Sequence, residues 1–417
     1  MKKWLTLALI EQSINSGSSF VFTILLARSM REEVLGMFFS FNLFYLLCQS
    51  IQHSVISAPA YSLVARLNEI SKGQTYFKFL LMRQMVLSLL FVSVYTWICL
   101  IFIRSEAKWI SLIVCIQYGL VLLFLLAFDF ARKWFIANQR HRNLVVVTSI
   151  RYFIQLAGIA LLSRIDKITL NGLGIILLLA PGVSLISAVV DKNCNFNLNL
   201  YLYGRLDRKT ASQHQKAALD LLPGAIMQWT SGGTYELQAL KVLGPSVFAV
   251  IKIVQSFVSP LNIINQFAEN WMIVFFAPKK SGGKELNNKE YGVKLLVGVA
   301  FIITILIFAV NLVAPYLLTF FYGPEYFDYG FMVTGYLIVV LLVILNTTIR
   351  SYLTANLSTT IIKFAYGAST AFAVGSSYLL VQKYNLYGVI FGAISSQLIL
   401  LVSMITYKQG RKRKQNT

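Results

Sequence analysis

The sequence predicts an all-helical protein that crosses a membrane about twelve times. Of its 417 residues, 57% are hydrophobic and only 13% are charged, whereas soluble domains average about 25% charged residues. The mean hydropathy is +0.67. The apolar residues also occur in runs long enough to span a bilayer. A soluble protein of this length needs more polar surface than this chain has, so a soluble enzyme is excluded.

Twelve segments reach the length of about 20 mostly apolar residues that a membrane-spanning helix needs. They are 4–27, 36–60, 80–103, 109–131, 144–163, 169–190, 217–240, 246–275, 293–320, 331–354, 361–382 and 386–407. The first run follows Lys2 and Lys3, as a signal peptide would. It carries Glu11 and Gln12 and has no small-residue cleavage site, so we expect it to be the first span.

The basic residues orient the chain. With the N-terminus in the cytoplasm, 26 Lys and Arg residues fall in inside segments and 8 in outside segments. Cytoplasmic loops are enriched in Lys and Arg, so we expect both termini to be cytoplasmic in a bacterial inner membrane. The net charge of +21 is therefore assigned to the loops and not to nucleic-acid binding.

Two six-helix halves are predicted. The longest connection, 191–216, is polar and basic, and it separates an N-terminal bundle (1–190) from a C-terminal bundle (217–417) as a cytoplasmic linker. The segment 26–36 resembles 239–249, because in each a long span and a basic residue precede a tight turn and a second long span. A parallel repeat of this kind is typical of alternating-access transporters, whose substrate site lies between the halves.

Polar residues recur at helical spacing along the first two spans of each half. Interhelical hydrogen bonds explain single residues of this kind, but a long polar stripe favours a helix that lines a hydrated central cavity. The candidates for the cavity wall are Gln12, Asn15, Gln228, Asn262 and Gln266.

Charged residues within the spans are costly and usually face a cavity or a partner. The cationic candidates for contact with an anionic cargo are Arg151, Lys252 and Arg350, and the acidic candidates for coupling or structure are Glu11, Glu236 and Glu269. Glu11 and Arg151 lie at similar depth and are a candidate structural pair, as are Lys252 and Glu236. The four cysteines and three histidines are scattered, so no cofactor, metal site or disulfide is predicted.

Three turns carry a resemblance to a known family. The first 65 residues resemble the start of the polysaccharide repeat-unit (O-antigen type) flippases, with a polar first span and then the turn Ala27-Arg28-Ser29-Met30-Arg31-Glu32-Glu33-Val34-Leu35-Gly36. The Gly-Pro of that family's turn is missing here and occurs in the second half as Gly244-Pro245. The segment Phe321-Tyr322-Gly323-Pro324-Glu325-Tyr326 is similar to the family's Phe-Gly-Pro-Glu-Tyr turn.

The resemblance implies the fold of the multidrug/oligosaccharidyl-lipid/polysaccharide exporter superfamily, in which two six-helix bundles form a V around a central cavity. It also implies a flippase that moves an undecaprenyl-pyrophosphate-linked oligosaccharide to the outer leaflet, with the polysaccharide polymerase machinery as a further partner. The alternatives are a multidrug-type antiporter or a peptidoglycan-precursor flippase of the same superfamily. A membrane polysaccharide polymerase is the alternative from a different class, but its catalytic loop is expected outside, where the loops of this chain are short.

Overall fold

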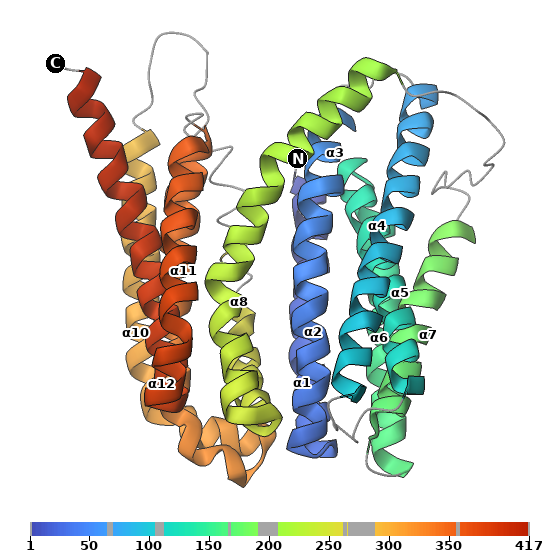
Figure 1. Ribbon diagram of the computed structural model, residues 1–417, viewed down its shortest axis with the longest axis vertical. Coiled ribbons are helices and arrows are strands. Elements are labelled where there is room, and N and C mark those ends of the chain that lie inside the picture. The colour runs from blue at the N-terminus through green and yellow to red at the C-terminus, as the bar shows by residue number, and fades with distance from the viewer. Residues whose placement is uncertain are drawn as a thin grey trace. The chain divides into compact units, whose positions relative to one another are not determined.

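The computed structural model describes residues 2–64, 70–104, 112–165, 168–190, 207–261, 265, 288–355 and 359–415, and every regular element among them is a helix. Figure 1 shows these helices as long rods. They are α1 (Lys2–Ser29), α2 (Glu32–Gln52), the π-helix η1 (His53–Ser57), α3 (Ala58–Val64), α4 (Ile70–Arg104), α5 (Leu112–Ala137), α6 (His141–Ile165), α7 (Leu170–Val190), α8 (Arg208–Val258), the 3-10 helix η3 (Ser259–Leu261), α10 (Asn288–Tyr322), the 3-10 helix η4 (Pro324–Tyr329), α11 (Gly330–Ala355) and α12 (Thr359–Gln415).

The prediction of an all-helical multi-pass membrane protein is confirmed. Among the described residues, eight helical stretches are long and apolar enough to cross a membrane, and Ile307–Tyr322 is a shorter apolar helix. The polar helix α1 falls outside this set. Two of the eight stretches, Arg208–Leu261 and Thr360–Thr406, have 54 and 47 residues, and each contains one non-helical residue, Gly244 in the first and Asn385 in the second. Each of these is long enough for two crossings.

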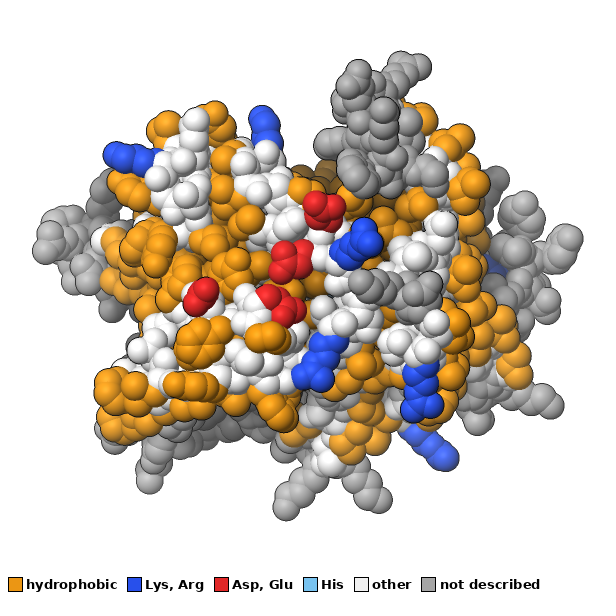
Figure 2. All heavy atoms as spheres, turned by 90° about the horizontal axis from the view of Figure 1, so that it is seen from below, with side chains coloured by type: hydrophobic (Ala, Val, Ile, Leu, Met, Phe, Trp, Pro, Cys, Tyr) orange, Lys and Arg blue, Asp and Glu red, His pale blue; other side chains and the backbone are white. Residues whose placement is uncertain are grey.

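Large hydrophobic side chains lie exposed along the helices. Phe153, Ile165 and Phe308 are 74%, 80% and 76% exposed. Hydrophobic side chains are also frequent in Figure 2, which views the molecule from below. Soluble proteins rarely expose large apolar patches to water, whereas the hydrocarbon of a bilayer accommodates such a surface. The exposed apolar sides of the helices are therefore the surface that faces the bilayer.

Two helix breaks fall at paired positions of the predicted repeat. Helix α1 ends at Ser29 and α2 begins at Glu32, and α8 is broken at Gly244, where φ is +88°. That φ suits glycine, because a Cβ is disfavoured in this backbone region. Gly36 is needed for a different reason: a Cβ built on it would lie 1.9 Å from the carbonyl oxygen of Pro245.

The chain divides into two compact units. The first comprises residues 1–30 and 40–226, and the second comprises 31–39 and 227–417. The dividing point after Ile226 lies inside α8, so this helix begins in the first unit and continues in the second. Of the predicted connection 191–216, residues 191–206 lie outside the described residues, and its last part is helical because α8 begins at Arg208.

Each unit has its own interior. In the first, Ile56, Tyr76, Leu80 and Phe130 belong to one buried apolar cluster. In the second, hydrogen bonds between helices add to apolar packing. Ser369 lies 2.8 Å from Ser396, which in turn donates to the carbonyl of Ser231, so α8 and two segments of α12 are joined. Small hydroxyl residues allow such close packing of helices in a bilayer.

Candidate functional site

Glu11 forms an ion pair with Arg132. Its Oε1 lies 2.6 Å from Arg132 Nε, and Thr148 Oγ1 donates to the same oxygen over 3.4 Å. The candidate pairing of Glu11 with Arg151 is therefore wrong. Arg132 stands one residue beyond the predicted fourth span, at a place where a basic side chain was expected to point to the cytoplasm. Its long side chain instead turns inward, because the buried carboxylate of α1 needs a partner.

Asp129 is a buried carboxylate that was not among the candidates predicted from the sequence. Its side chain is 2% exposed, Lys133 Nζ lies 2.7 Å away, and Gln49 Nε2 donates to it over 2.9 Å. The sequence contained a signal, since Asp129 and Lys133 are four residues apart and share one face of α5. Asp129 lies close to the end of its span, however, and was not counted among the intramembrane charges.

Arg151 has aromatic neighbours. Its guanidinium carbon lies 4.5 Å from the ring centre of Phe128 and 5.0 Å from that of Tyr152, distances typical of cation–π contacts. Its Nε is buried and has no hydrogen-bond partner among the described residues, and no described carboxylate forms an ion pair with it. A cation stacked in this way keeps its positive charge uncompensated.

The two polar cavity candidates of α1 contact their own unit. Gln12 is buried, and its amide donates to Ser16 over 3.2 Å. Asn15 is partly buried and accepts a hydrogen bond from the hydroxyl of Tyr152 on α6. Asn15 therefore helps to fix Tyr152, whose ring contacts Arg151. Asn15 thus contacts α6 while Gln12 bonds within α1, and the role of both residues at a cavity stays a prediction.

In the second unit, the candidate pair of Lys252 and Glu236 forms. Lys252 Nζ lies 2.5 Å from Glu236 Oε2, and the two side chains are 10% and 15% exposed. Gln255 bridges the pair, because its Nε2 donates to Glu236 over 2.7 Å while its Oε1 accepts from Lys252 over 3.0 Å. With both charges compensated, this cluster contributes little net field.

Arg350 has neutral hydrogen-bond acceptors. Its Nη1 lies 2.9 Å from the Tyr366 hydroxyl and 3.4 Å from Gln228 Oε1, and both partners belong to the second unit. Two of the predicted site residues, Arg350 and Gln228, are thus brought together by α8 and α11. The candidates Asn262, Gln266 and Glu269 lie outside the described residues.

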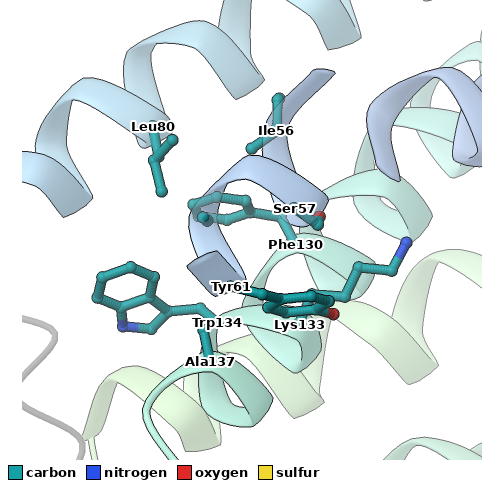
Figure 3. Close-up of a pocket in the computed structure, with 9 residues that line it drawn as sticks. Ile56, Ser57, Tyr61, Leu80, Phe130, Lys133, Trp134 and Ala137 are labelled. Carbon is teal, nitrogen blue, oxygen red and sulfur yellow. The ribbon is translucent and has the colours of Figure 1, made fainter. Parts of the chain in front are cut away.

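A small cavity lies beside this charge network in the first unit. It has a volume of about 10 Å³, which is room for roughly one water molecule. Figure 3 shows the rings of Phe130, Tyr61 and Trp134 around it, while the Lys133 side chain reaches away from Trp134. Ser57 also lines the cavity, and its buried hydroxyl has no hydrogen-bond partner among the described residues. The cavity is far too small for a sugar.

The charge balance summarises the site. The described parts of the predicted spans hold four carboxylates. Glu11, Asp129 and Glu236 each have a cationic nitrogen within 2.7 Å, whereas Asp220 is exposed near the start of the span 217–240. Within the network of the first unit, these pairs leave Arg151 as an additional cation. No group of three or more His, Cys, Asp or Glu residues that suits a metal ion occurs in the described part of the chain.

Comparison with known proteins identifies the fold. No protein-family model matches the sequence, and no curated protein does either. Among solved structures, the chain is similar to an inward-facing multidrug resistance MATE family transporter of the MOP superfamily, with a TM-score of 0.72, 13% identity and 96% of each chain covered. An outward-facing structure of such a transporter gives a TM-score of 0.65 at 13% identity, covering 97% of this chain and 93% of that one.

A third solved structure has a similar fold. It is a MOP superfamily transporter from Pyrococcus furiosus, described as having a binding pocket of reverse polarity that suggests a different function, and it matches with a TM-score of 0.68 at 11% identity over 98% of this chain and 95% of that one. The chain therefore has the fold of MOP superfamily transporters.

Proposed function

We propose that this protein is an alternating-access flippase that carries an undecaprenyl-pyrophosphate-linked oligosaccharide from the cytoplasmic to the outer leaflet. Two observations support the transport step. The similar solved structures are transporters, described in inward-facing and outward-facing conformations. The turns at 27–36, 244–245 and 321–326 resemble those of the O-antigen type flippases.

The uncompensated charge of Arg151 carries the choice of cargo. In the buried network of the first unit, the carboxylates of Glu11 and Asp129 are matched by Arg132 and Lys133, and Arg151 is the additional cation. A pyrophosphate is an anion, and guanidinium groups bind it through paired hydrogen bonds. An inside-negative potential would assist the outward movement of such an anion by about 2.3 kcal/mol per charge per 100 mV.

A multidrug antiporter is the second candidate, because similar solved structures carry that description. A cationic drug needs carboxylates that are available to it. Glu11, Asp129 and Glu236 already have cations at 2.5–2.7 Å, so a drug could bind any of these three only if an ion pair broke. Asp220 is exposed, but it lies near the start of its predicted span. The Pyrococcus furiosus transporter is described as having reversed pocket polarity, and this supports the use of charge to separate functions within one fold.

The experiment is complementation of a strain that lacks its own polysaccharide flippase. Arg151→Gln should reduce surface polysaccharide at least tenfold at normal protein abundance, and Arg151→Lys should retain part of the activity because it keeps the charge. Arg164→Gln is the matched control, since Arg164 lies exposed on the same helix, α6. Normal polysaccharide with Arg151→Gln would remove the observation on which the choice of cargo rests.

The same strains distinguish the two candidate functions. They are challenged with a panel of cationic dyes while the wild type and Glu236→Gln are expressed. If the protein is a flippase, neither the wild type nor Glu236→Gln should change the dye resistance of the strain. Resistance that requires Glu236 would instead favour the multidrug antiporter.

A further inference from the structure

His214 is a buried titratable residue that the candidate site does not use. It lies on the first two turns of α8, immediately before the predicted span 217–240, in a segment otherwise rich in exposed residues. Gln213 and Gln215 on either side are exposed, whereas His214 is 0% exposed. A fully buried histidine at the cytoplasmic end of a membrane helix needs a structural reason.

Both ring nitrogens of His214 have partners in the first unit. Nε2 lies 2.9 Å from the carbonyl oxygen of Val55, and Nδ1 lies 2.7 Å from the hydroxyl of Tyr76 on α4. A carbonyl oxygen only accepts, so Nε2 must carry the hydrogen. Nδ1 of the neutral ring then accepts the hydrogen of the Tyr76 hydroxyl. The geometry thus specifies one neutral tautomer.

The carbonyl of Val55 needs an outside donor because of Pro59. In an α-helix this carbonyl would accept from the N–H of residue 59, and proline has none. The chain forms a π-helix at His53–Ser57, and the N–H of Ala58 bonds to the carbonyl of His53. At the edge of a membrane an unsatisfied backbone carbonyl is costly. His214 Nε2 supplies the hydrogen bond.

The surroundings disfavour a charged imidazole. The ring lies edge-on to Tyr76 and Phe79, with centroids 5.8 and 5.5 Å away, and Arg83 stacks on Phe79 at 4.5 Å. Burial disfavours the charged ring first, and the cation Arg83 on α4 adds to this effect. The π-helix presents the carbonyl of Val55 and carries His53, and α8 itself carries the exposed Lys209 and Lys216. A second positive charge would be buried beside aromatic rings and close to Arg83.

We propose that His214 is a proton-sensitive latch within the first unit, which fastens the start of α8 to α4 and the π-helix by supplying the hydrogen-bond donor that Pro59 lacks. The latched segment continues along α8 into the part of the second unit that starts at Met227. Acidification of the cytoplasmic side favours the released state, because the imidazole binds a proton readily only when it leaves its buried position. The latch concerns the chain itself and holds whatever the cargo is.

A double-mutant cycle tests the donor. The full chain is purified in detergent, and its thermal midpoint is followed by size-exclusion chromatography. His214→Ala should lower the midpoint by roughly 4 °C or more, and Gln213→Ala, the exposed neighbour, should leave it unchanged. Pro59→Ala restores an N–H at residue 59, so His214→Ala should cost less than half as much in that background. An equal cost in both backgrounds would overturn the latch.

A pH series tests the proton sensitivity. Between pH 7.5 and pH 5.5 the wild-type midpoint should fall, because the unfolded chain takes up a proton on histidine near pH 6.5 while the buried ring resists it. His214→Gln cannot become charged and should show a smaller fall, whereas Gln213→Ala, which removes no titratable group, should keep the wild-type fall. A His214→Gln profile that matches the wild type would show that the latch does not respond to protons.

Discussion

Arg132 and Arg151 are 19 positions apart in the chain and belong to one polar region of the first unit, but only Arg132 pairs with Glu11. Arg132 neutralises a carboxylate that is 4% exposed, whereas Arg151 is stacked on rings and holds no carboxylate among the described residues. Arg132→Met should therefore reduce folding, and Arg151→Met should reduce transport at near-normal protein level. Both substitutions remove one positive charge and keep a long side chain.

The magnitude follows from the burial of the pair. At 2.6 Å and an effective dielectric constant of about 20, the gross attraction is about 6 kcal/mol, and desolvation offsets most of it. Removing one partner leaves the other charge buried, which costs roughly 3–5 kcal/mol. A loss of that size is a large part of the stability of a typical domain. Arg132→Met should accordingly lower membrane abundance severalfold.

The assay compares four chains expressed at the same level as fluorescent fusions. Membrane abundance and thermal midpoint are measured for the wild type, Arg132→Met, Arg151→Met and the double variant Glu11→Gln/Arg132→Met. The double variant should recover much of the abundance, because a neutral glutamine does not need a cation and can still accept from Thr148. Equal loss of abundance in Arg132→Met and Arg151→Met, or no recovery in the double variant, would refute the assignment of the pair.

Three more substitutions test other contacts. Glu236→Gln should lower the thermal midpoint by roughly 10 °C through the stranded Lys252, and Glu236→Gln with Lys252→Met should lower it less; a double variant worse than the single would count against the pair. Gly36→Val should lower protein abundance, since its Cβ would meet the carbonyl of Pro245 at 1.9 Å, and normal abundance would contradict this contact. Arg350→Ala should impair surface polysaccharide more than Arg350→Lys, and equal polysaccharide at equal abundance would remove Arg350 from the cargo site.

The local features of the chain were predictable from its sequence. The helices follow the apolar runs, because a run of about 20 residues without charges is stable only as a helix in lipid. The break between α1 and α2 and the break at Gly244 fall where the turns were expected. Glycine and charged residues mark such breaks through their own backbone preference and solvation, which neighbouring helices do not need to supply.

The ion pairs show most clearly which features the sequence predicts and which depend on the tertiary structure. The position of a residue within its span indicates its depth in the membrane. Similar depth correctly predicted the pair of Lys252 and Glu236, which lie on either side of the break at Gly244. Depth also suggested Arg151 for Glu11, but the carboxylate is bound by Arg132. The position of a charged residue along its helix gives its depth in the membrane. Its ion-pair partner depends on how each helix is rotated about its axis and on the conformation of the long side chain.

What the sequence by itself determined is the helical class, the apolar surface, the main breaks and the excess of positive charge. Only the tertiary structure decided that Asp129 is a buried partner of Lys133, that Arg151 stacks on Phe128, and that His214 completes the hydrogen bonding of a π-helix about 160 positions earlier. Helix formation depends on residues within one or two turns, and the sequence records these directly. Contacts between helices depend on packing across tens of residues, because a hydrogen bond or ion pair forms only when two separate surfaces meet at about 3 Å.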